Sequence, residues 1–179
     1  MEKLDTQRMT LVPMGLKALV AACSDPVGAL RRMGFEADPF SPDEMSQLRE
    51  IYAMKIYFVK NYPDAWHFST SWQMILRRNR AAVGELGFKG PPINETVEIG
   101  YSVRPNYRGR QLMTEAVEAL CRFALTQTAF PVRAVMAYTR KENLASQKVL
   151  KRCGFIKDKP KFGYLSWRLE RQRAVNAIG

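Results

Sequence analysis

The segment Arg108-Gly109-Arg110 combines residue types that bind phosphate groups. It lies between an apolar strand pattern over residues 96–103 and an amphipathic helix pattern over residues 112–126. A glycine in such a connection lets neighbouring backbone N–H groups converge on one point, and the helix that follows adds roughly half a positive charge there. The segment therefore predicts an anion-binding site. An ordinary strand–loop–helix connection with solvated arginines is the alternative.

The elements on both sides of this loop are regular. The strand over residues 96–103 alternates apolar and polar side chains, the period-two pattern of a strand with one buried face. The helix repeats apolar residues at helical spacing, at Leu112, Ala116, Leu120 and then Phe123 or Ala124. Because ligands of α/β sheets bind at the carboxyl ends of strands, we expect the site at this junction.

Positive charge is concentrated in the second half of the chain. The sequence has 28 Lys and Arg against 17 Asp and Glu, a net charge of +11. Residues 1–100 hold 12 of each sign, so residues 101–179 hold 16 basic and 5 acidic side chains. The asymmetry favours a polyanionic ligand for the second half. Nucleic acid, an anionic membrane and a multiply phosphorylated cofactor all fit it.

Length and composition indicate one soluble domain. We expect a single domain over residues 1–179, with residues 170–179 as a flexible tail that is a frayed helix or unstructured. The N-terminus has no apolar signal core, and no apolar run approaches the roughly 18 residues of a membrane span. These features predict a cytoplasmic protein with no membrane partner.

Cysteine and histidine give no metal-binding pattern. Cys23, Cys121 and Cys153 are odd in number and form no C-x-x-C motif, so neither a disulfide framework nor a zinc site is indicated. We expect them to be small buried residues. His67 is the only histidine, which excludes a histidine-rich centre and makes it a surface or packing residue. No metal is expected.

The other elements follow from hydrophobic period and turn residues. Strands are predicted over residues 10–12, 68–76, 82–88, 134–139 and 164–169, and helices over 15–22, 26–33 and 142–152. Ser41 and Glu44 form a capping box that starts a further helix ending near Val59, and Gly154 is expected to end the last helix. This order implies an α/β fold in which helices cover both faces of a mixed sheet.

Several blocks of sequence together resemble one family. They are Val97-Glu-Ile-Gly-Tyr101, Arg104-Pro-Asn-Tyr-Arg-Gly109, Met113-Thr-Glu-Ala116, Asn143-x-x-Ser146 and Gly154-Phe155. In this order and spacing they resemble the GNAT superfamily of acyl-CoA-dependent N-acetyltransferases, closest to the Rim-type branch of ribosomal-protein N-terminal acetyltransferases. The resemblance covers about residues 66–169. It implies a GNAT-like fold with a central, mostly antiparallel sheet of about six to seven strands.

The resemblance implies acetyl-CoA as the co-substrate. Its pyrophosphate would accept hydrogen bonds from the backbone of residues 108–114, and its pantetheine would extend the sheet beside the end of the strand. Lys148 and Arg152 lie one helical turn apart and would meet the 3′-phosphate, with a solvated basic face as the alternative. The residues expected to contact acetyl-CoA are Ser102, Val103, Arg108, Gly109, Arg110, Gln111, Leu112, Met113, Thr114, Asn143, Lys148 and Arg152.

The loop departs from the family pattern at two positions. Gln111 and Met113 stand where the family has its second glycine and a small residue. Either side chain would crowd the phosphates if it pointed inward, which would weaken or block binding. Because helical backbone angles need no glycine, we expect Gln111 to project away and binding to survive.

Acetyl transfer requires an uncharged amine. A lysine-type amine is neutral in only about 1 part in 2,500 at pH 7, whereas a peptide α-amine is neutral in roughly 10%. A general base therefore matters most for lysine-type acceptors. Glu98 is the candidate base because it lies on the polar face of the strand, where Gly100 leaves room for substrate or a relay water. An ion pair with Arg80 or Arg133 is the alternative role.

The departing thiolate needs a proton or a hydrogen bond. Many family members use a tyrosine at the position that is Leu150 here, so the hydroxyl that matches the Rim-type pattern is that of Ser146. Asn143, one helical turn away, would contact pantetheine or order the site. Their alternative roles are an ordinary helix serine and a helix cap. A backbone N–H near Ser102 or Val103 would polarise the thioester carbonyl.

The resemblance predicts an N-acetyltransferase acting on a primary amine, either a peptide N-terminus or a small molecule. A catalytically silent acyl-CoA-binding module of the same fold is the alternative. A nucleic-acid partner is disfavoured because no basic strand with interleaved aromatic residues is present. A homodimer is compatible with the sequence. The acceptor pocket is expected among the helices over residues 15–59, residues 62–72 and residues 157–164, with the aromatic residues Trp66, His67, Trp72, Phe162 and Tyr164.

Overall fold

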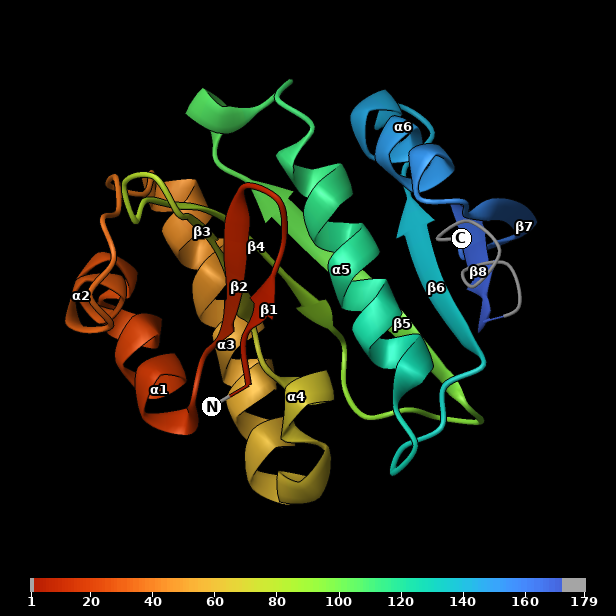
Figure 1. The fold of residues 1–179 in the computed structure, drawn as a ribbon, viewed down its shortest axis with the longest axis horizontal. Helices are drawn as coiled ribbons and strands as arrows, with labels where there is room; N and C mark the ends of the chain where they lie inside the picture. Colours follow the sequence, from red (N-terminus) through yellow and green to blue (C-terminus); the bar gives the residue numbers. More distant parts are fainter. Residues whose placement is uncertain (1, 172–179) are drawn as a thin grey trace.

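A twisted eight-stranded sheet organises the computed structural model, which describes residues 2–171 (Figure 1). The strand order is β1-β2-β3-β4-β5-β6-β8-β7. The part of the predicted tail over residues 172–179 lies outside the described residues. The strands are β1 (Leu4–Asp5), β2 (Met9–Pro13), β3 (Trp72–Leu76), β4 (Ala82–Phe88), β5 (Thr96–Val103), β6 (Ala134–Thr139), β7 (Ile156–Lys161) and β8 (Tyr164–Glu170).

Within residues 2–171, β5 and β6 are the only neighbouring strands that run parallel. These two strands pair from Thr96 opposite Ala134 to Glu98 opposite Met136 and then diverge, as Figure 1 shows. On its other side β5 stays paired with β4 as far as Val103. The sheet therefore opens at the carboxyl ends of β5 and β6, the position at which we expected the site.

Helices cover both faces of the sheet. Helix α5 crosses one face, and α3 packs on the other together with α1 (Figure 1). The helices are α1 (Leu16–Ser24), α2 (Pro26–Arg32), α3 (Pro42–Asn61), α4 (Trp66–Ser69), α5 (Leu112–Thr126) and α6 (Leu144–Arg152), with 3-10 turns η1 (Pro63–Ala65) and η2 (Pro105–Tyr107). The predicted α/β fold with a mostly antiparallel sheet is confirmed, and the sheet has eight strands rather than six or seven.

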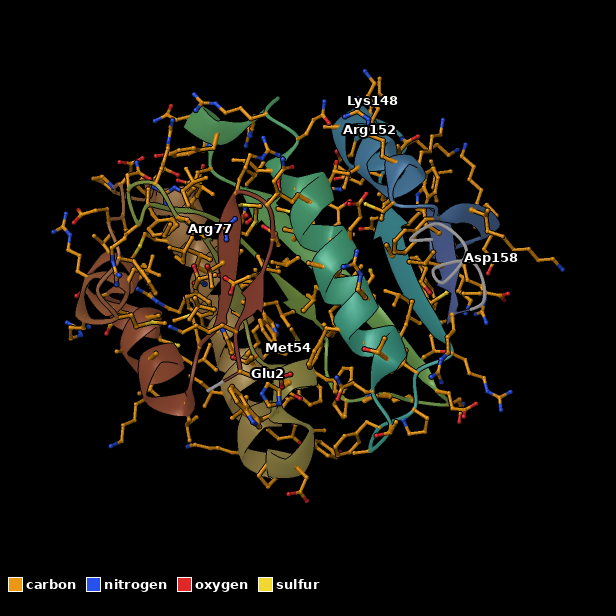
Figure 2. All side chains as sticks on the ribbon, viewed as in Figure 1. Glu2, Met54, Arg77, Lys148, Arg152 and Asp158 are labelled. Atoms are coloured by element: carbon orange, nitrogen blue, oxygen red, sulfur yellow. The ribbon has the colours of Figure 1, made fainter. Side chains whose placement is uncertain are left out.

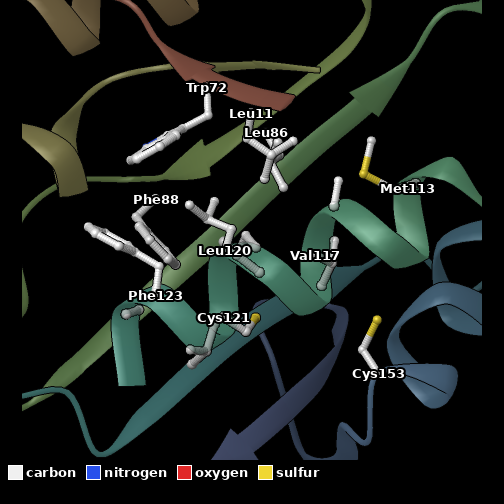
Figure 3. Close-up of a cluster of buried hydrophobic side chains, with 14 of the residues drawn as sticks. Leu11, Trp72, Leu86, Phe88, Met113, Val117, Leu120, Cys121, Phe123 and Cys153 are labelled. Carbon is white, nitrogen blue, oxygen red and sulfur yellow. The ribbon is translucent and has the colours of Figure 1, made fainter. Parts of the chain in front are cut away.

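The apolar stripe of α5 forms the main core with the sheet. The positions predicted from helical spacing, from Leu112 to Ala124, are all buried. Figure 3 shows Leu120 and Phe123 directed toward Phe88 and Trp72 of the sheet, and the rings of Trp72 and Phe123 lie 5.3 Å apart. Burial of this kind stabilises a fold by roughly 25 cal/mol per Å² of apolar surface. The packing fixes the start of α5 beside the end of β5.

Local signals in the sequence explain most boundaries. Ser41 Oγ accepts from the N–H of Glu44, and the Glu44 carboxylate accepts from the N–H of Ser41, so the predicted capping box is confirmed at the start of α3. Gly154 follows α6 with φ of +79°, as expected of a residue that ends a helix.

Three segments differ from the prediction, and the shortest is the two-residue strand β1, which was not predicted. Phe68 was predicted to begin a strand, but it lies in α4 and the strand begins at Trp72. β7 was not predicted, because its residues IKDKPK are all exposed and carry no alternating pattern. A charged edge strand that contains a proline has no buried face to reveal it in the sequence.

Cysteine and histidine have packing roles. All three cysteines are free, and Cys121 and Cys153 are buried as predicted, whereas Cys23 is half-buried. The His67 ring packs against the Trp66 ring at 4.0 Å, and burial lowers the pKa of its imidazole. Within residues 2–171 there is no cluster of three possible metal ligands and no helix long and apolar enough to cross a membrane.

Candidate active site

A cavity of about 540 Å³ lies where β5 and β6 diverge. We call it the loop cavity, because the arginine loop and the start of α5 form one wall and α6 forms the other. All twelve residues predicted to contact acetyl-CoA line it, and Ser146 lines it too. Its lining is Tyr101, Ser102, Val103, Tyr107, Arg108, Gly109, Arg110, Gln111, Leu112, Met113, Thr114, Asn143, Ala145, Ser146, Lys148, Val149 and Arg152.

The backbone of the arginine loop presents a row of free donors. The N–H groups of residues 109–114 donate to no acceptor in the described part of the chain. The Arg108 N–H is not available to a ligand, because it donates to the Pro105 carbonyl at 3.2 Å. The predicted row of donors therefore begins one residue later, at Gly109, whose φ is +74°.

Gln111 does not have the helical backbone that we expected. Its φ is +59° and its ψ is 12°, the left-handed conformation that favours glycine. The expectation that this position needs no glycine is therefore wrong. The family glycine would fit here without strain, whereas the backbone of Gln111 is strained. The Gln111 side chain is exposed and lines the cavity.

Met113 leaves the loop free of crowding. Its side chain is only 6% exposed and belongs to the main core, where Figure 3 shows it beside the first turn of α5. Thr114, the next residue, is also buried, and its hydroxyl has no hydrogen-bond partner among the described residues. The hydroxyl oxygen itself is buried from solvent, so it does not add a donor to the cavity surface.

Ion pairing and exposed basic side chains surround the loop. Arg8 pairs with Glu115 of α5 at 2.7 Å and donates to the Arg110 carbonyl at 2.9 Å. Burial opposes ionisation of Glu115, but hydrogen bonds from Thr6 and Arg8 hold the pKa of its carboxyl below the usual range. Lys148 and Arg152 extend from the outer side of α6, where Figure 2 labels them, and form no ion pair within residues 2–171.

Three candidate site residues meet at the start of α6: Asn143 and Ser146, which were predicted, and Tyr101, which was not. Asn143 Oδ1 accepts from the Ser146 N–H at 3.1 Å, so Asn143 is the helix cap that we considered as its alternative role. The Ser146 carbonyl accepts from the Tyr101 hydroxyl at 3.3 Å. Burial raises the pKa of Tyr101 well above its ordinary value, so this hydroxyl stays protonated. Tyr101 was predicted only as part of the apolar strand face.

Glu98 lies apart from the loop cavity. It is in the stretch of β5 that is still paired with β6, and its carboxylate forms an ion pair with Lys89. Neither of the partners that we considered contacts it: Arg133 pairs with Glu95 at 2.6 Å, and Arg80 donates to the Gly34 carbonyl. Glu98 therefore remains a predicted base that lines no cavity described here.

A second cavity, of about 140 Å³, lies on the α3 side of β4 and β5. We call it the α3 cavity. It shares Tyr101 and Ser102 with the loop cavity, so both cavities border β5. Its lining is Ile51, Met54, Lys55, Ser71, Glu85, Leu86, Gly87, Lys89, Gly100, Tyr101 and Ser102.

The contribution of α3 to this cavity agrees with the predicted use of residues 15–59, but the predicted aromatic residues do not line it. Trp72 is fully buried in the core, and Phe162 is 92% exposed on the β7–β8 turn. The acceptor pocket predicted around those aromatic residues therefore stays a prediction, separate from the α3 cavity. A carboxylate within the buried strand β4 was the signal that could have identified this cavity.

That carboxylate is Glu85, and one of its oxygens is heavily hydrogen-bonded. Glu85 Oε2 accepts from Tyr52 Oη at 2.8 Å, from Ser71 Oγ at 2.8 Å and from Gln73 Nε2 at 2.9 Å. Burial and the nearby carboxylate raise the pKa of Tyr52, which therefore remains a donor. The second oxygen, Oε1, accepts no hydrogen bond from any described residue.

Lys55 is a buried cation in the same wall. It is 6% exposed, and its Nζ donates to the carbonyls of Thr70 at 2.9 Å and Phe88 at 3.0 Å. Burial lowers the pKa of Lys55 to about 8, although the nearby Glu85 charge opposes this effect. Gly87 leaves the space for this ammonium group, because a Cβ there would lie 3.1 Å from Lys55 Nζ.

Comparison with known proteins places this arrangement in a family. The description "Acetyltransferase (GNAT) domain" matches residues 8–156, which is most of the chain. The uncharacterized N-acetyltransferase YjdG of Bacillus subtilis (strain 168) is 29% identical over 165 residues, which are 92% of this chain and 95% of that protein.

Solved structures share the fold. RimL, a ribosomal L7/L12 alpha-N-protein acetyltransferase solved in complex with coenzyme A, superposes with a TM-score of 0.66 at 15% identity, over 94% of this chain and 98% of that one. The microcin C7 self-immunity acetyltransferase MccE, in complex with acetyl-CoA and AMP, gives 0.59 at 15% identity, over 92% and 93%. The predicted GNAT resemblance is confirmed, and Rim-type enzymes are among the structures that share this fold. The chain belongs to the GNAT family of acetyltransferases and is an N-acetyltransferase.

Proposed function

We propose that this protein transfers the acetyl group of acetyl-CoA to a primary amine, either a peptide N-terminus or the amine of a small molecule. The observation that carries the proposal is the row of free N–H groups over residues 109–114, beside Arg108 and Arg110, in the cavity at the end of β5. Acetyl-CoA supplies the acetyl group as a thioester and carries the phosphates that such donors bind.

The loop residues fit the phosphate-bearing part of that co-substrate. Backbone donors and the start of α5 suit a pyrophosphate, and the exposed Lys148 and Arg152 suit a further phosphate near α6. On the side of β5 that faces β6, residues 99–103 pair with no strand in the described chain. The backbone there can pair with the amide groups of pantetheine near Ser102 and Val103.

The reaction forms one C–N bond and breaks one C–S bond. The neutral amine attacks the thioester carbonyl carbon, and the products are the N-acetyl amine and coenzyme A. One proton leaves the amine nitrogen and one is needed by the departing sulfur, so no other reactant is required. We assign the proton at sulfur to Ser146, whose hydroxyl lines the loop cavity. Glu98 lines neither cavity, so it would accept the amine proton through a relay water and not directly.

Release of coenzyme A thiol from acetyl-CoA, measured over a panel of acceptors, tests the proposal. The panel comprises peptides with free N-termini, spermidine, an aminoglycoside and simple primary amines. We expect release that depends on an amine acceptor and yields the N-acetyl product by mass spectrometry. Binding of acetyl-CoA without release for any acceptor would instead indicate the catalytically silent module. Absence of both binding and release would refute the proposal.

A further inference from the structure

The α3 cavity has the position of an acceptor site. It lies on the opposite side of β5 from the arginine loop and shares Tyr101 and Ser102 with the loop cavity. Gly87 and Gly100 are opposite each other on β4 and β5, and both line the α3 cavity. Two glycines in register remove two side chains from this part of the sheet. A group bound in the α3 cavity can therefore approach the strand edge along which the thioester would lie.

Glu85 lines this cavity and has one carboxylate oxygen that accepts no hydrogen bond from a described residue. Its Oε2 is held by three donors, from Tyr52 of α3, Gln73 of β3 and Ser71 just before β3, which fix the carboxylate plane. Oε1 has no partner among residues 2–171, and it is not a buried unsatisfied atom. A carboxylate oriented by three donors, with its second oxygen accessible, is built to accept a hydrogen bond from a ligand N–H.

The remaining wall limits the size and charge of that ligand. Ile51, Met54 and Leu86 give it an apolar flank. A cavity of about 150 Å³ holds a benzene-sized group, so the 140 Å³ here suits a head of about six non-hydrogen atoms. Lys55 and Lys89 also line the cavity, and Glu85 is its single carboxylate. A second ammonium group on the ligand would therefore meet two cations.

We propose that the α3 cavity is the acceptor subsite and that Glu85 Oε1 accepts a hydrogen bond from the amine of a compact, singly charged acceptor with an apolar flank. A peptide N-terminus that begins with a small apolar residue has this chemistry, as does a free amine of the same size. Extended polyamines do not. The inference rests on the proposed acetyl transfer and adds the acceptor class and the residue that selects it.

Steady-state kinetics with four acceptors test the assignment. The acceptors are alaninamide, trialanine amide, a matched peptide amide beginning with leucine, and spermidine. The wild type should use the two alanine acceptors at least tenfold more efficiently than spermidine, by kcat/KM. Glu85→Gln should lower kcat/KM for the alanine acceptors about tenfold to a hundredfold, the range expected when a charge-assisted hydrogen bond is lost. The KM for acetyl-CoA should stay unchanged.

Two further variants separate recognition from damage to the fold. A Cβ at Gly100 would meet only Lys89 Cε, at 3.7 Å, so Gly100→Ala adds a methyl group to the cavity without strain. It should raise KM more for the leucine peptide than for trialanine amide, a change of selectivity that general destabilisation would not produce. The exposed Glu118 on α5 supplies the control, and Glu118→Gln should leave all constants unchanged.

The outcomes are distinguishable. Transfer by the wild type that Glu85→Gln leaves unchanged would overturn the assignment of Glu85 and leave the proposed function standing. Spermidine as the preferred acceptor would overturn the acceptor class. Binding of acetyl-CoA with no transfer by the wild type to any acceptor would overturn the proposed function and this inference together. Use of trialanine amide but not alaninamide would show that the acceptor is a peptide.

Discussion

Ser146 and Glu98 were predicted together, but the structure places them in different surroundings. Ser146 lines the loop cavity beside Tyr101, whereas Glu98 is paired with Lys89 on the closed part of β5. We expect Ser146→Ala to lower kcat by roughly tenfold to a hundredfold without changing acetyl-CoA affinity, because general acid catalysis contributes to the transition state. Stopped-flow thiol release with saturating substrates measures it.

Glu98→Gln provides the companion measurement. Because Glu98 is proposed to act as a base through water, removal of its charge should lower kcat by about tenfold or more. The exposed Glu50→Gln serves as a control for a general change of charge. If neither Ser146→Ala nor Glu98→Gln slowed the reaction, both predicted roles would be wrong, and the Tyr101 hydroxyl would become the first group to test.

Lys55 predicts a specific dependence of stability on pH. Burial lowers its pKa to about 8 from 10.5, so between these values the unfolded chain binds a proton that the folded chain does not. The resulting penalty is fully present below about pH 8 and disappears as pH rises toward 10.5. Relative to Lys55→Met, the unfolding free energy of the wild type should therefore rise by about 2 kcal/mol from pH 7.5 to 9.5.

Urea unfolding of both proteins under reducing conditions measures this difference. Groups such as Cys153, whose pKa burial raises to about 12, titrate equally in both chains and cancel. A wild-type minus variant difference that is flat across the window would show that Lys55 is not desolvated as the structure indicates.

Residue roles were predictable only where they follow from adjacent positions. The loop residues 108–114 are contiguous, and Asn143 and Ser146 are one helical turn apart, so sequence spacing alone brought them together. The Glu85 site joins side chains as far as 33 positions apart, Tyr52 and Glu85, through the packing of α3 on the sheet. The carboxylate within the buried strand β4 was the one local signal, and the partners of Glu85 could be identified only in three dimensions.

At the scale of elements, the junction between η2 and α5 carries a strained residue. Gln111 has a left-handed backbone, which costs a non-glycine residue roughly 1 kcal/mol. We expect Gln111→Gly to raise the unfolding free energy by up to about 1 kcal/mol and to bind acetyl-CoA at least as tightly. Urea unfolding and calorimetric titration measure these two quantities.

Gln127 is the matched control for that substitution. It caps the other end of α5 with φ of −63°, so Gln127→Gly should destabilise the protein through chain entropy and through loss of the hydrogen bond from Gln127 Nε2 to the Phe123 carbonyl. Equal losses of stability for both glycine variants would contradict the left-handed backbone at Gln111.

Most elements were predictable because each has its own period or capping residue. The capping box of α3, the apolar stripe of α5 and the alternation of β5 all set boundaries within a few residues of those observed. The elements that were missed, β1, α4 and β7, lack such a signal. β7 is a strand because it pairs with β8, and its own charged sequence carries no pattern that predicts this pairing.

At the scale of the whole molecule, four of the sixteen basic residues of the second half line one cavity. Arg108, Arg110, Lys148 and Arg152 all line the loop cavity. The double variant Lys148→Ala, Arg152→Ala should weaken acetyl-CoA binding about tenfold and leave 3′-dephospho-CoA binding nearly unchanged. The exposed Lys151, which does not line the cavity, gives the control variant Lys151→Ala. Equal weakening toward both ligands would place the 3′-phosphate elsewhere. A cytoplasmic location and a homodimer remain predictions from the sequence.

The central claim is that the free donors over residues 109–114 hold the phosphates of acetyl-CoA. Isothermal titration of the purified protein with acetyl-CoA tests it most directly. We expect one site per chain, a dissociation constant in the micromolar range, and a rise in unfolding temperature that grows with ligand concentration. No heat of binding and no shift in unfolding temperature at millimolar acetyl-CoA would contradict the account.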